Sequence, residues 1–81
     1  MDLSEIEDLI ESNIEDADAE VSRTRGPHDD DHLGATVVSP AFEGLSLVDQ
    51  HQLVYDALEG KMTRDIHALE LKTYTPQEYE A

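Results

Sequence analysis

The chain has 81 residues, with twenty acidic residues against five basic ones and no cysteine. This length suits one domain, spanning residues 1–81, whose core is too small to enclose a catalytic cavity walled on all sides. The lack of cysteine excludes disulfides, thiolate metal ligands and cysteine nucleophiles, so any metal chemistry must use histidines, carboxylates or ligands from a second molecule.

The formal net charge of −15 is distributed along the chain rather than gathered in one tail. Such a surface repels nucleic-acid phosphates and anionic membranes. We interpret it as adaptation to a salt-rich cytoplasm, such as that of a halophilic archaeon, although an ordinary acidic protein is the plainer reading. No apolar run is long enough to cross a bilayer, and the N-terminus lacks the features of a signal peptide. We therefore expect a cytoplasmic protein without membrane contact.

The first half of the chain predicts one helix and two strands. Apolar residues recur at three- and four-residue steps with acids on the opposite face, which predicts an amphipathic helix over Leu3, Ile6, Leu9, Ile10 and Ile14. Alternation over 17–25 predicts a strand that Gly26-Pro27 ends, and a loop over 28–32 follows. The β-branched run 34–39 predicts a second strand, antiparallel to the first. A turn over 39–44 follows, and we expect Phe42 to anchor it to the core.

The second half predicts helix, strand and helix. Ser46 begins a long helix that Gly60 ends, and its apolar residues have the spacing of one buried stripe: Leu47, Val48, His51, Val54, Tyr55 and Leu58. A connection over 61–65 leads to an alternating strand over 66–74. Thr75-Pro76-Gln77-Glu78 then predicts a helix with a capping box. The order α-β-β-α-β-α predicts an α+β domain, with a three-stranded mixed sheet, its helices on one face and the other face open.

Two blocks of the sequence are similar to the BolA-like family. The first is Ser39-Pro40-Ala41-Phe42-Glu43-Gly44 with Val48, His51, Leu53, Val54 and Tyr55; the second is Ile66-His67-Ala68-Leu69 with Lys72-Thr73-Tyr74-Thr75-Pro76-Gln77-Glu78-Tyr79. The resemblance covers nearly the whole chain and implies the class II KH-like fold, α-β-β-α-(α)-β-α. The sequence departs from the family at Gln50-His51-Gln52, where Arg-His-Arg is usual, and at Tyr79, where tryptophan is common.

The resemblance also implies a function. BolA-like proteins pair with monothiol glutaredoxins and share a [2Fe–2S] cluster in iron–sulfur trafficking and iron homeostasis, with sulfur ligands from the glutaredoxin and its glutathione. The BolA-like chain supplies a histidine from the last strand, which matches His67. It supplies a second ligand from the loop after the first strand, which matches His28, slightly preferred, or His32. We expect a non-enzymatic adaptor that is monomeric and without cofactor when alone, and heterodimeric with its partner.

Plainer explanations exist for each candidate residue. By spacing alone, His67 is more often a buried core histidine than a ligand, and two histidines in a surface loop are a weak metal signal. Arg64 is either a contact for a glutathione carboxylate or an ordinary exposed arginine. His51 is expected to pack and donate a hydrogen bond, or else to belong to a partner surface.

Other functions are weaker. The run Asp29-Asp30-Asp31 lacks the spacing of a calcium loop and is expected to be solvated. The alternative function is a KH-like nucleic-acid-binding transcription regulator, against which stand the net charge and the lack of a Gly-x-x-Gly loop. A zinc-binding or purely structural partner is a third possibility. No catalytic motif is present, so we do not expect an enzyme.

Overall fold

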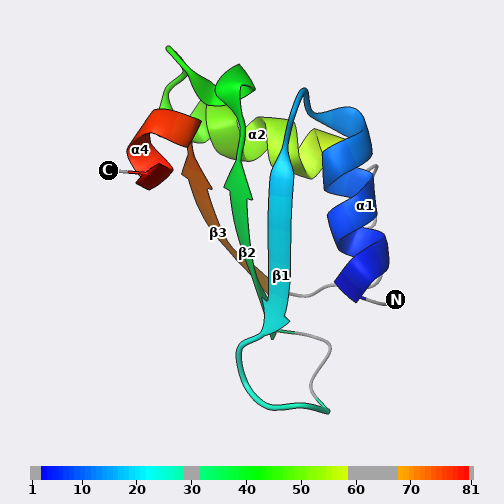
Figure 1. Cartoon of the computed structure of the whole chain (residues 1–81). Coiled ribbons are helices and arrows are strands. Elements are labelled where there is room, and N and C mark those ends of the chain that lie inside the picture. Colours follow the sequence, from blue (N-terminus) through cyan, green and yellow to red (C-terminus); the bar gives the residue numbers. More distant parts are fainter. Residues whose placement is uncertain (1–2, 29–31, 59–67, 81) are drawn as a thin grey trace.

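The computed structural model describes residues 3–28, 32–58 and 68–80. Its elements are α1 (Leu3–Asn13), β1 (Asp18–Arg23), β2 (His32–Val38), the 3-10 turn η1 (Pro40–Phe42), α2 (Leu47–Ala57), β3 (Ala68–Tyr74) and α4 (Pro76–Glu80). The strands form one sheet in the order β1-β2-β3, in which β2 is antiparallel to β1 and parallel to β3. Figure 1 shows α2 crossing behind the strands, α1 beside β1, and α4 near the end of β3. The predicted α+β domain with a three-stranded mixed sheet is confirmed.

The alternation of side chains along the strands gives the sheet two unlike faces. Along β2, Leu33, Ala35 and Val37 are buried and the residues between them are only half-buried. Successive side chains of a strand point to opposite faces, so one face carries the core and the other meets solvent. The core consists of Ile6, Ile10, Ile14, Ala19, Val21, Leu33, Ala35, Val37, Phe42, Val54, Ala57 and Leu58. Among the described residues, no helix has the length and apolar character that crossing a membrane requires.

The predicted apolar stripe of α2 is only partly buried. Val54 and Leu58 are fully buried, but Leu47 and Val48 are 62% and 76% exposed, and Tyr55 is 39% exposed. The predicted stripe contained two pairs of adjacent residues, Leu47 with Val48 and Val54 with Tyr55. It was therefore wider than the strip of helix surface that the sheet covers. The prediction was wrong for the first turn of α2 and for Tyr55.

The boundaries of the first two strands also differ from the prediction. β2 begins at His32, which the sequence had assigned to the loop, because the backbone N–H and Oγ1 of Thr24 both donate to the His32 carbonyl at 3.1 Å. β1 ends earlier, at Arg23, and Gly26 then adopts a φ of 126°, which favours glycine. The predicted helix end at Gly60 and the first two residues of the predicted strand 66–74 lie outside the described residues.

One buried residue, Ser39, joins three segments of the chain through its hydroxyl and its backbone N–H. Ser39 Oγ donates to the carbonyl of Glu15 and accepts from the N–H of Ala41 at 3.0 Å. The backbone N–H of Ser39 donates to the carbonyl of Tyr74 at 3.0 Å. A fully buried hydroxyl needs such partners, because an unsatisfied one costs free energy. The turn after α1, the end of β3 and η1 are thereby fixed together, with Phe42 buried as predicted.

The two helix starts predicted from capping residues are formed. Ser46 Oγ accepts from the N–H of Asp49 at 3.2 Å at the start of α2. At α4, Thr75 Oγ1 accepts from the N–H of Glu78 at 3.2 Å, and Glu78 Oε1 accepts from the N–H of Thr75 at 2.9 Å. This reciprocal pair satisfies two backbone donors that a helix N-terminus otherwise leaves without partners.

Two acidic side chains of α1 accept hydrogen bonds from backbone N–H groups at the outer edge of the sheet. Glu7 Oε2 accepts from the backbone N–H of Val21 at 2.8 Å, and Glu11 Oε2 accepts from that of Ala19 at 3.0 Å. β1 is an edge strand, and unpaired donors along an edge promote association with other strands. The sequence had predicted that acids fill the solvent face of this helix, whereas these two turn toward the sheet.

We expect Glu7→Ala and Glu11→Ala each to lower the free energy of unfolding by about 1–3 kcal/mol, because each leaves a part-buried strand donor without its charged acceptor. Urea unfolding followed by circular dichroism measures the change. Asp8→Ala, at an exposed position of the same helix, is the control and should change stability by no more than about 0.5 kcal/mol. Equal losses in all three variants would contradict this role for the two carboxylates.

Candidate metal centre

The candidate site lies at the end of the sheet where β1 finishes and β2 and β3 begin. The parallel register pairs His32, the first residue of β2, with Ala68, the first residue of β3. His67 directly precedes Ala68 in the sequence. His67 itself, Arg64 and the run Asp29-Asp30-Asp31 lie outside the described residues. The described part of the site therefore consists of His28, His32 and the strand ends around them.

The two loop histidines have different environments. His28 is exposed in the turn that follows Gly26. His32 is half-buried, and its carbonyl is held by Thr24, so its backbone is part of the sheet ladder. His32 shares the parity of Gly34, which is the side of β2 opposite the core. The exposed side chain of His28 is accessible to a metal or a partner outside the domain. The backbone of His32 is held in the sheet.

The described histidines of this end are of a type that binds metal ions. Neutral imidazole binds iron or zinc through one nitrogen. A [2Fe–2S] cluster takes four protein ligands, two of which are histidines in Rieske centres. Among the described residues, no group of three histidine, cysteine or acidic side chains is placed to hold one metal ion. The residues fit a cluster for which this chain gives one or two imidazoles and another molecule gives the rest.

His51 lies apart from this end, on α2. The side chain is half-buried, and its Nε2 is shielded from solvent with no hydrogen-bond partner in the described part of the chain. The expected packing role agrees with this burial, but the expected hydrogen bond is not found there. Its neighbour Gln50 makes the polar link instead: its Nε2 donates to the Leu45 carbonyl at 3.0 Å, and its Oε1 accepts from Thr73 Oγ1 at 2.6 Å.

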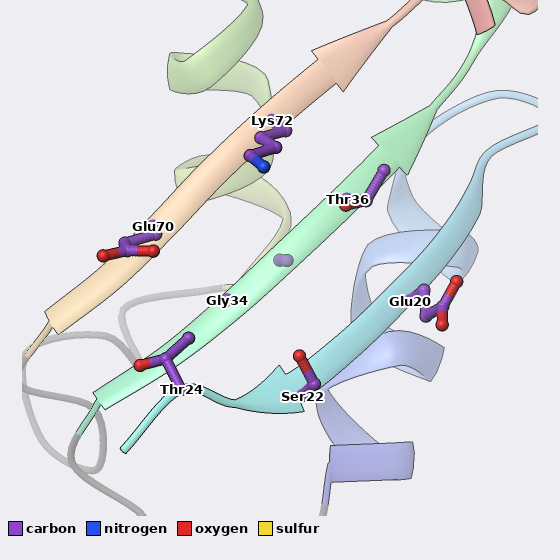
Figure 2. A pocket seen from close by; sticks show the side chains of 8 residues that line it. Glu20, Ser22, Thr24, Gly34, Thr36, Glu70 and Lys72 are labelled. Atoms are coloured by element: carbon purple, nitrogen blue, oxygen red, sulfur yellow. The ribbon is translucent and has the colours of Figure 1, made fainter.

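The residues of the open sheet face were not predicted as a site from the sequence. Figure 2 shows them around a shallow hollow on that face: Glu20, Ser22, Thr24, Gly34, Thr36, Glu70 and Lys72. The available signal was the polar parity of three strands combined with a glycine in the middle of the central one.

The fold and this end of the sheet define a class of protein: a small α+β domain that can present histidines next to the start of its last strand. Residues 6–78 match the model of the BolA-like protein family. The solved structure of a BolA homologue from Coxiella burnetii superposes with a TM-score of 0.83 and 40% sequence identity, covering 100% of this chain and 99% of that one.

Two curated relatives carry different names. SufE-like protein 1, chloroplastic/mitochondrial, from Arabidopsis thaliana is 35% identical over 77 residues, which cover 88% of this chain and 21% of the relative. The DNA-binding transcriptional regulator BolA of Vibrio cholerae is 45% identical over 49 residues, which cover 60% of this chain and 46% of the relative. The chain thus spans less than half the length of either relative. It belongs to the BolA-like family.

We expect His28→Ala to change the free energy of unfolding by less than about 0.5 kcal/mol, because the side chain is exposed. His32→Ala should lower it by no more than about 1 kcal/mol, because a half-buried side chain is lost while the strand backbone stays paired. Urea unfolding of both variants checks this. A loss of several kcal/mol in either would mean that the histidine is mainly a structural residue.

Proposed function

We propose that this chain is a cytoplasmic, non-enzymatic BolA-like adaptor that shares a [2Fe–2S] cluster with a monothiol glutaredoxin. The observation that carries the proposal is the pairing of His32 with Ala68, which brings the start of β2 together with the start of β3. His28 lies in the turn that follows β1, at this same end of the sheet. The role of such a complex would lie in iron–sulfur cluster trafficking or iron homeostasis.

In this proposal the cluster ligands of this chain are His67 and one loop histidine, His28 or His32. The glutaredoxin thiolate and the thiol of its bound glutathione give the other two ligands. The cluster would supply iron and sulfide for transfer and the redox chemistry of its two irons. Arg64 would pair with a carboxylate of glutathione, since guanidinium binds carboxylate in a bidentate manner.

The part of this chain is to orient nitrogen donors and to leave one side of the site open to a second protein. A ligating imidazole needs its other ring nitrogen to be hydrogen-bonded, because that bond fixes the tautomer. The exposure of His28 supports a ligand that approaches from outside the domain. Because its acidic surface repels anionic partners at long range, the chain should associate most readily with a partner whose contact surface is basic.

The direct test is anaerobic reconstitution of the chain with a monothiol glutaredoxin from the same cell, iron, sulfide and glutathione, followed by visible circular dichroism. We expect a heterodimer spectrum distinct from that of the glutaredoxin alone. His67→Ala should abolish that difference, since an imidazole ligand is lost, and either His28→Ala or His32→Ala should alter it.

His51→Gln is the matched control, because it removes a histidine on α2 that is distant in sequence from the site. It should leave the spectrum unchanged. If the glutaredoxin spectrum does not respond to the wild-type chain, shared ligation is excluded. If the glutaredoxin spectrum responds equally to the wild-type chain and to His67→Ala, the two proteins form a complex in which His67 is not a cluster ligand.

A transcription regulator is the second candidate, favoured by the name of the Vibrio cholerae relative. In the described part of the chain the cations are Arg23, Arg25 and Lys72. Phosphate binding depends on such cations and releases counterions, so true DNA contacts weaken steeply as salt rises. The charge of this chain favours the adaptor over the regulator.

We expect no saturable binding of duplex DNA in a fluorescence anisotropy titration, even at low salt, because the net charge of −15 repels the phosphates. The homologous Vibrio cholerae protein serves as a positive control. Saturable binding whose affinity falls steeply with added salt would revive the regulator, and Lys72→Gln would then locate the contact.

A further inference from the structure

The open face of the sheet is hollowed along its length. One hollow, of about 250 Å³, is lined by residues of all three strands, including Glu20, Ser22, Thr36, Glu70 and Lys72 (Figure 2). Serine and threonine are short, so the hydroxyl-bearing side chains leave the backbone of the sheet accessible between the longer charged ones.

Gly34 forms the floor of this hollow. It lies in the middle of β2, and a Cβ at this position would approach Thr24 Cγ2 to 3.0 Å. Glycine weakens a strand, and its presence there often marks a place where another group comes close to the backbone. The hollow therefore exists because the central strand has no side chain at its centre and short ones beside it.

A second, smaller hollow continues the first toward α4. It is lined by Asp18, Glu20, Thr36, Val38 and Tyr79. Glu20 and Thr36 line both hollows, so the two lie next to each other; together we call them the open-face groove. Tyr79 is 56% exposed and lies with its ring centroid 5.6 Å from that of Tyr74, at an angle of 53°. An aromatic side chain thus borders the end of the groove farther from the histidines.

The chemistry of the open-face groove selects its occupant. Three carboxylates line it, those of Asp18, Glu20 and Glu70, against the single ammonium of Lys72. Guanidinium binds carboxylates in a bidentate manner and stacks on aromatic rings. An ammonium ion binds carboxylates only as a point charge. In an extended chain alternate side chains point to one side, so such a segment can direct two cations into the two hollows.

We propose that the open-face groove docks an extended segment of a partner protein that carries arginines at alternate positions. One guanidinium lies in the first hollow, against Glu70. The next lies in the second hollow, against the carboxylates of Asp18 and Glu20 and the ring of Tyr79. Serine and threonine hydroxyls of the groove bind the backbone of the segment. His32 lies on the same face of β2 but does not line this groove, and docking there does not depend on a shared cluster.

The test uses the full chain labelled with ¹⁵N and the blocked peptide Ser-Arg-Thr-Arg-Ser, in low salt. We expect the amide signals that shift during titration to be those of the groove, led by Ser22, Gly34 and Thr36. The same peptide with citrulline in place of arginine keeps the shape and loses the charge. It should produce shifts at least about fivefold weaker at equal concentration.

Two pairs of substitutions separate the groove from the overall charge of the chain. Glu20→Gln with Glu70→Gln should weaken peptide binding at least about fivefold, because each removes a charged acceptor. Glu15→Gln with Glu43→Gln makes the same change of charge at exposed positions outside the groove and should weaken it less than about twofold. Thr36→Lys, which places a cation where the two hollows join, should also weaken binding.

Several outcomes would overturn the proposal. Shifts spread over the helices, or equal losses in both pairs of variants, would mean attraction by net charge alone. Shifts of the same residues with magnesium chloride at matched ionic strength would assign the groove to a metal cation. Shifts of the same residues on raising the protein concentration without peptide would assign it to a second copy of the chain. Circular dichroism of each variant establishes that the fold is retained.

Discussion

The parallel pairing of β2 with β3 is the constraint on which the other features of this domain depend. Its register sets His32 beside Ala68, so the first residues of β2 and β3 lie at one end of the sheet. A parallel pair requires a long crossover connection, and α2 lies within it. The same pairing makes β2 the central strand, whose alternation then decides which side chains form the core and which face outward.

The two edges and two faces of such a small sheet are treated differently. The core face is covered, and two backbone donors at the outer edge of β1, those of Ala19 and Val21, are satisfied by the carboxylates of Glu11 and Glu7. An edge closed in this way does not invite another strand. The face opposite the core keeps short polar side chains around Gly34 and is bordered by Tyr79. Acidic residues therefore serve both as internal acceptors and as an outward-facing charged surface.

Membership of the BolA-like family accounts for the fold, and the solved Coxiella burnetii homologue shares it over nearly its whole length. Our two proposals assign functions to two surfaces that differ in chemistry. The histidine end offers nitrogen donors for a shared metal centre in our proposal, and the open-face groove offers carboxylates and an aromatic ring for a basic segment.

The sequence by itself determined the elements and their order, since these depend on local periodicity and capping. The spacing of Ile6, Ile10 and Ile14 predicted α1, and Thr75 with Glu78 predicted the start of α4. The family resemblance also rested on local sequence motifs, and the match to the family model confirms it. What the sequence could not decide was which residues a second element covers. The exposure of Val48 follows from how much of α2 the sheet can reach.

The tertiary structure alone decided the contacts between distant segments. That Glu7 accepts from Val21 depends on how α1 lies against β1, which no periodicity encodes. The extension of β2 to His32 depends on hydrogen bonds from Thr24 across the hairpin. The groove around Gly34 needs three strands in register before residues of all three line it together. Local chemistry therefore fixed the elements, and long-range pairing fixed the surfaces to which we assign functions.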